Sequence, residues 1–226
     1  MGQTSVQGID QWGAFYRQGR GNVYPDENLV RLVRGKYADI PRSGRALDVG
    51  FGRGGNLVFL AQSGYEAHGF EVSQDSIEAA TQLAEQAGVT LQLGQLSGTH
   101  LPYPDGHFDL VISWGAVYYY GSRTLVTAAI QEFHRVIRDG GVLLMSVIHP
   151  NSFMVRRFSG DLGDGAHQID REDPHDNRFG MTIFYDGSSS GWRRLISVFE
   201  DVEEGYAEAD LFVPQRRDAW RLFLAR

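Results

Sequence analysis

The sequence predicts an α/β fold built on a doubly wound, mostly parallel β-sheet. An apolar run at 46–49 stops in a glycine-rich stretch at 50–55 and restarts with helical periodicity, which is typical of a strand, a turn and a helix. Further predicted strands follow in the same rhythm: one at 65–71 that ends in a carboxylate, an alternating one at 89–93, and apolar runs at 108–113 and 142–147. Near the end, two alternating runs flank a turn-like segment and predict an antiparallel hairpin, with strands at 207–213 and 219–224 and the turn at 214–218.

Helical segments between these runs carry their own start signals. Asp26 precedes an apolar face running from Leu29 to Tyr37, and Ser73 precedes another that ends at Ala87. A third stripe, Trp192 to Phe199, predicts a helix before the hairpin. A Gly-Gly pair, Gly140 and Gly141, predicts a turn before the fifth strand.

The glycine-rich stretch has the spacing G-x-G-x-G, at Gly50, Gly52 and Gly54. Glycine is needed where the backbone turns tightly or approaches a ligand, because a Cβ would clash. The dinucleotide fingerprint has a different spacing, G-x-G-x-x-G. Asp48 stands two residues before the loop and would repel a pyrophosphate, but it suits a ligand with an ammonium group, such as the amino-acid end of S-adenosylmethionine (SAM). A glycine-rich turn with no ligand remains the alternative for the loop by itself.

A second carboxylate, Glu71, stands at the end of the second predicted strand. It follows Asp48 by about twenty residues, the spacing at which a βαβ unit brings an acidic side chain to a ribose. A carboxylate can accept hydrogen bonds from both ribose hydroxyls. The sequence therefore predicts a nucleoside-binding site at the carboxyl edge of the sheet.

The five predicted strands from 46–49 to 142–147, taken in order with the glycine loop and Glu71, resemble the class I SAM-dependent methyltransferases of the small-molecule type. The resemblance covers about residues 29–147 well and the ends more loosely. It implies a Rossmann-like seven-stranded sheet that ends in an antiparallel hairpin, SAM as cofactor, and methyl transfer to an O or N of a small metabolite. The cofactor-binding residues that it implies are Tyr16, Asp48, Gly50, Gly52, Gly54, Asn56, Glu71, Val72, Gln95, Leu96 and Trp114. Many relatives carry an aspartate where this chain has Gln95.

The resemblance also implies an organisation for a single domain over residues 1–226. An aromatic-rich segment at 1–25 is expected to fold over the cofactor as a lid, and 149–182, where periodicity fails, is expected to be an inserted substrate cap after the fifth strand. His149 follows the fifth strand and is the candidate general base, because imidazole titrates near neutral pH. Tyr118, after the fourth strand, is the second candidate catalytic residue and a candidate for the substrate wall.

Composition narrows the classes of function. The chain has 226 residues, no cysteine and a formal net charge of -7, which disfavours a nucleic-acid partner and excludes thiolate chemistry. Neither a membrane-spanning run nor a metal-ligand pattern stands out, so we expect a cytoplasmic monomer or homodimer without a metal. Three alternatives stay open: a methyltransferase of RNA or protein, a non-catalytic SAM-binding module and, more distantly, a nicotinamide dehydrogenase on the same fold.

Overall fold

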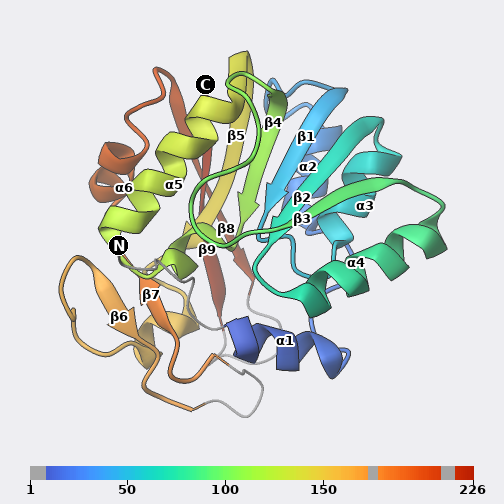
Figure 1. Ribbon diagram of the computed structural model, residues 1–226. Helices are drawn as coiled ribbons and strands as arrows, with labels where there is room; N and C mark the ends of the chain where they lie inside the picture. The colour runs from blue at the N-terminus through green and yellow to red at the C-terminus, as the bar shows by residue number, and fades with distance from the viewer. Residues whose placement is uncertain (1–8, 173–177, 210–216) are drawn as a thin grey trace.

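The structure is a computed structural model that describes residues 9–172, 178–209 and 217–226 (Figure 1). Its centre is a seven-stranded sheet in the order β3-β2-β1-β4-β5-β9-β8. The first five strands pair in parallel and the last two are antiparallel. The strands are β1 Gly44–Val49, β2 Tyr65–Glu71, β3 Leu91–Gln95, β4 Phe108–Trp114, β5 Ile137–Ile148, β8 Val202–Ala209 and β9 Asp218–Ala225. This sheet confirms the predicted fold class.

Helices cover both faces of the sheet and bury one apolar cluster on each. The first face carries α2 Glu27–Arg34, α3 Gly55–Gln62 and α4 Gln74–Ala87, with Leu29, Leu57 and Leu60 fully buried. The second face carries α5 Arg123–Val136 and α6 Ser189–Leu195, with Ile130, Phe133 and Trp192 in its core. Burying a side chain of this size stabilises the fold by about 1.5–3 kcal/mol.

Local capping explains several helix starts. The Asp26 carboxylate accepts the backbone N–H groups of Asn28 at 2.8 Å and Leu29 at 3.3 Å, as the sequence predicts for α2. Ser122 caps α5 in the same way through the N–H of Leu125. Ser73 occupies the predicted N-cap position of α4, although its hydroxyl makes no capping hydrogen bond.

The structure corrects some predicted boundaries. Strand β8 begins at Val202 rather than at 207. The sequence does not reveal the first part of this exposed edge strand, because its acidic residues interrupt the alternation of apolar and polar side chains. Gly140 and Gly141 lie inside β5, where the pairing with β4 shifts register between Phe108 and Leu110 as a bulge. Helix α6 ends at Leu195, before Phe199. Most of the predicted hairpin turn, 214–216, lies outside the described residues, as does the end of its first strand at 210–213.

Two further segments gather at one end of the sheet, below it in Figure 1. One is α1 Ile9–Arg17, from the predicted lid. The other is the predicted cap at 149–182, which contains η2 Phe153–Arg157 and β6 Ala166–Gln168; β6 pairs antiparallel with β7 Thr182–Phe184, which begins at the last residue of the predicted cap. Residues 173–177 of the cap and 1–8 of the lid lie outside the described residues. The ordered hairpin escapes prediction because three-residue strands leave no periodicity.

A glycine substitution tests how α3 and α4 pack under the loop. Gly54 has a φ of 85°, and a Cβ there would lie 2.7 Å from the Cβ of Ala80 in α4. Gly88 is the matched control, because it has a φ of 66° and nothing within 4 Å of its Cβ position. We expect Gly88→Ala to cost about 1–2 kcal/mol for the left-handed backbone, and Gly54→Ala to cost about 1–3 kcal/mol more for the clash. Urea unfolding measures both, and equal losses would contradict this packing.

Candidate cofactor site

Two adjoining cavities open at the carboxyl ends of the parallel strands. The first, of about 100 Å³, lies between the ends of β1, β2 and β4, η1 Val117–Tyr120 and α1. The second, of about 300 Å³, lies beside the glycine loop. Both are lined by Tyr16, Gly50 and Gly115, so they meet at these residues. This is the edge at which open α/β sheets bind their ligands.

The glycine loop presents bare backbone to both cavities. Gly50 and Gly52 have φ values of 79° and 59°, in the left-handed region. A Cβ at Gly50 would lie 2.5 Å from the Cβ of Ala116, and one at Gly52 would lie 3.2 Å from the Oη of Tyr16. The loop therefore needs glycine both for its turn and for the close approach of its neighbours.

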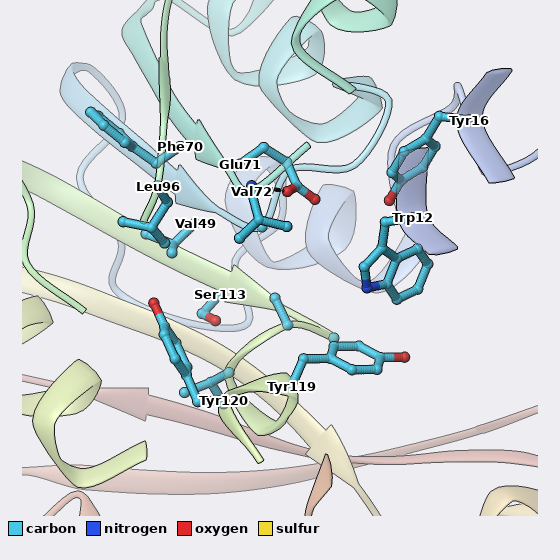
Figure 2. Close-up of a pocket in the computed structure, with 14 residues that line it drawn as sticks. Trp12, Tyr16, Val49, Phe70, Glu71, Val72, Leu96, Ser113, Tyr119 and Tyr120 are labelled. Atoms are coloured by element: carbon cyan, nitrogen blue, oxygen red, sulfur yellow. Dashed lines mark hydrogen bonds between the residues drawn. The ribbon is translucent and has the colours of Figure 1, made fainter. Parts of the chain in front are cut away.

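Glu71 ends β2 on the wall of the first cavity and is only 6% exposed. Its Oε2 accepts the backbone N–H of Val72 and, at 3.3 Å, that of Ser73. Burial raises the pKa of Glu71 to about 7, and the hydrogen bonds from the backbone oppose that rise only in part. Figure 2 shows its carboxyl group beside Val72, facing the space that Tyr16 and Trp12 close from the other side.

Asp48 lies one residue before the end of β1 and is 1% exposed. Neither carboxylate oxygen has a hydrogen-bond partner among the described residues. Burial raises the pKa of Asp48, and the negative charge of Glu71 raises it further. A buried acid without a partner is costly for a fold. The pair is therefore well suited to a ligand that brings positive charge.

The lid helix α1 closes the site through specific contacts. Arg17 pairs with Asp75 at the start of α4, and the ring of Trp12 meets Tyr119 edge to face at 5.2 Å. Tyr16 stands between the two cavities, and burial raises the pKa of its hydroxyl, as does the nearby Glu71. Gln11 donates to the carbonyl of Phe179 at 3.0 Å, so the lid contacts the cap as well.

Comparisons with known proteins find similarity to methyltransferases. Residues 46–141 match the model of a methyltransferase domain. A malonyl-[acyl-carrier protein] O-methyltransferase of Enterobacter lignolyticus is 31% identical over 74% of this chain and 59% of its own. The uncharacterized methyltransferase YcgJ of Bacillus subtilis is 27% identical over 58% of this chain and 51% of its own. The chain therefore spans little more than half the length of these curated relatives.

Solved structures agree on the fold. The PH0226 protein of Pyrococcus horikoshii superposes with a TM-score of 0.68 at 18% identity, covering 94% of this chain and 98% of that one. A SAM-dependent methyltransferase of Methanosarcina mazei superposes with a TM-score of 0.67 at 17% identity, over 82% of this chain and 93% of that one. Residues 46–141 are therefore similar to a methyltransferase domain, and the fold is one that SAM-dependent methyltransferases share.

The described residues fit SAM, the cofactor of the SAM-dependent methyltransferases that share this fold. Asp48 has no hydrogen-bond partner among the described residues, and it lines neither cavity itself. Its negative charge suits the ammonium group of the amino-acid end, which it would attract from behind the glycine loop. Glu71 suits the ribose hydroxyls, and Val72 and Leu96 offer apolar walls to an adenine ring. The predicted cofactor-binding residues that line one or both cavities are Tyr16, Gly50, Gly52, Asn56, Glu71, Val72, Leu96 and Trp114.

Besides Asp48, two predicted cofactor-binding residues line neither cavity. Gly54 lines neither cavity and packs against Ala80. Gln95 is exposed, and its side-chain amide donates to the carbonyl of Val72 at 3.0 Å. It thereby supports the backbone next to Glu71. A direct contact between Gln95 and the adenine stays a prediction.

The candidate catalytic residues are not brought to either cavity. Tyr118 is 1% exposed and its ring lies 4.6 Å from that of Tyr119. The Nδ1 of His149 accepts the N–H of Asn151 at 3.1 Å, and its ring lies 4.6 Å from Tyr206 on β8. Burial lowers the pKa of His149. Neither residue lines the two cavities, so their catalytic roles stay predictions without support from this geometry.

Sequence reasoning missed several lining residues. Trp12, Tyr119 and Tyr120 add aromatic walls, and Figure 2 shows the last two opposite Glu71 and Val72. Ser113 is fully buried on the first cavity, and its hydroxyl has no partner among the described residues. Position alone offered a signal, because Trp12 lies in the lid, Ser113 lies at the carboxyl end of β4, and the two tyrosines follow that strand. Across the described parts of the chain, no helix has the length and apolarity to cross a bilayer, and no cluster of acids and histidines suits a metal ion.

The raised pKa of Glu71 predicts a pH-dependent cofactor affinity. Below about pH 7 its carboxyl group holds a proton, and it loses one of the acceptor positions that a ribose diol uses. We expect the affinity for S-adenosylhomocysteine (SAH), the demethylated product, to be constant above that pH and to fall by up to about tenfold per pH unit below it. Calorimetric titrations from pH 5 to 9 measure this. The Glu71→Gln variant is the control, and an equal pH slope in both proteins would contradict the assignment.

Proposed function

We propose that this protein transfers the methyl group of SAM to an oxygen or nitrogen of a small molecule. The observation that carries the proposal is the pair of buried carboxyl groups, Asp48 and Glu71, beside bare backbone at Gly50 and Gly52. When bound, SAM would supply a methyl group on a positively charged sulfur, and this sulfur would leave as the neutral sulfide of SAH as a lone pair on the acceptor bonds to the methyl carbon. The similarity to an O-methyltransferase supports an acceptor of this kind.

In this proposal the chain contributes by binding, orienting and excluding water. Glu71 and the apolar wall of Val72 and Leu96 hold the nucleoside, and the glycine loop holds the amino-acid end. Alignment of the reacting groups can lower a barrier by about 7–11 kcal/mol. The contact between Gln11 of the lid and Phe179 of the cap supports closure from both sides, which keeps water from the reacting atoms.

A second candidate function is a SAM-binding module without turnover. It is favoured by the placement of His149 and Tyr118, since neither lines the two cavities. The same placement is compatible with a methyltransferase that relies on positioning and has no general base. The net charge of -7 supports a small acceptor over RNA. A cytoplasmic location and a monomeric or homodimeric state belong to the same proposal.

A binding experiment with matched variants tests the cofactor part of the proposal. We expect the wild-type protein to bind SAM and SAH, and Glu71→Ala and Asp48→Asn to weaken SAH binding by about 10- to 100-fold, the range for hydrogen bonds to a charged group. Glu85, exposed on α4, is the control, and Glu85→Ala should bind as the wild type does. Isothermal calorimetry reports the affinities, and circular dichroism confirms folding. A folded wild-type protein that binds neither compound would refute the proposal.

Methyl-group transfer is then measured with isotope-labelled SAM against small carboxylates, alcohols and amines, with bulk RNA and protein as separate arms. Transfer to a small acceptor supports the proposal. Binding without transfer in any arm favours the module, and transfer only to RNA or protein overturns the small-molecule assignment.

A further inference from the structure

Arg53, at the second variable position of the glycine loop, carries an unused hydrogen-bond donor beside the second cavity. It lines that cavity together with Tyr16, Gly52 and Asn56. Its Nε is buried and has no partner among the described residues. Burying a polar donor without a partner costs free energy, so a ligand that accepts from it gains affinity.

The same side chain also holds the lid segment that connects α1 to α2. The Nη1 of Arg53 donates to the carbonyl of Gly19 at 2.8 Å. Gly21 has a φ of 97°, and a Cβ there would lie 3.2 Å from the Cδ of Arg53 and 3.1 Å from the ring of Tyr16. The lid segment therefore lies directly on Arg53, a residue that also lines the second cavity.

The charges of the site divide into two sets that match an amino-acid group. Asp48 and Glu71 offer negative charge from beneath the loop and from the end of β2. The described residues that line the second cavity include one cationic side chain, Arg53, and one acidic side chain, Asp26. The carboxylate of Asp26 already caps α2. An amino-acid group carries an ammonium and a carboxylate, and a guanidinium is the strongest side-chain partner for a carboxylate.

We propose that Arg53 binds the carboxylate of the cofactor's amino-acid end and, through Gly19, couples that contact to closure of the lid. The inference rests on the proposed function, because it takes SAM and SAH as the ligands. Beyond the proposed function, it assigns Arg53 to the carboxylate of the ligand. It follows that a ligand with the carboxylate closes the lid and that a ligand without it does not.

The first test compares SAH with its decarboxylated analogue, S-adenosyl-3-thiopropylamine, which keeps the adenosine and the amine. For the wild-type protein we expect SAH to bind about 10- to 100-fold more tightly than the analogue. In Arg53→Gln, SAH should lose its affinity advantage over the analogue, while the affinity for the analogue stays within about twofold of the wild-type value. Arg53→Lys keeps the positive charge and should retain part of the advantage of SAH. Arg31→Gln, on the exposed face of α2, is the matched control and should behave as the wild type.

The second readout is the lid itself. Trypsin cuts after arginine, and Arg17 and Arg20 lie in the lid. SAH should slow cleavage there in the wild type, the analogue should not, and neither ligand should protect Arg53→Gln. Binding of SAH by the wild type with no preference over the analogue, or an unchanged preference in Arg53→Gln, would overturn the carboxylate contact. Equal protection by both ligands would overturn the coupling. Failure of the wild type to bind SAH at all would instead refute the proposed function.

Discussion

Two carboxyl groups held away from water at the ends of neighbouring strands are the constraint on which the rest of this site depends. Asp48 and Glu71 are 1% and 6% exposed; burial raises the pKa of both carboxyl groups, and the charge of Glu71 raises that of Asp48 further. A fold retains such a pair against its own stability only where something compensates. The glycine loop beside the pair, whose Cβ positions would collide with Ala116 and Tyr16, leaves the space through which a cationic ligand approaches.

The surrounding elements turn this electrostatic feature into an enclosed site. Helix α3 continues from the loop, and α4 starts just after Glu71, so the two acids are tied to rigid elements rather than to mobile loops. The lid reaches across both cavities, with Tyr16 at their junction and Trp12 against Tyr119. Its contact with the cap at Phe179 joins two segments that lie far apart in the sequence. Enclosure lowers the local dielectric constant and strengthens every charge interaction inside.

Much of this could be predicted from the sequence, and the rest fails for physical reasons. Strand β2 and its terminal Glu71 could be predicted from the distance to Asp48 and the rhythm of the neighbouring segments, both of which are read from the sequence alone. The start of β8 was missed because an edge strand does not need to alternate, and the β6–β7 pair is too short to show a period. His149 follows a strand end as predicted, but the direction of its side chain depends on packing against Tyr206, which lies 57 positions further along the chain. Trp12 and Tyr119 come together only through the tertiary fold.

The most direct test of this account is a crystal structure of the protein with SAH. The account predicts the ribose hydroxyls on the Glu71 carboxylate, the adenine against Val72 and Leu96, and the ammonium group over the backbone of the glycine loop on the side of Asp48. SAH bound away from these residues, or its ribose turned away from Glu71 in an otherwise unchanged site, would contradict it.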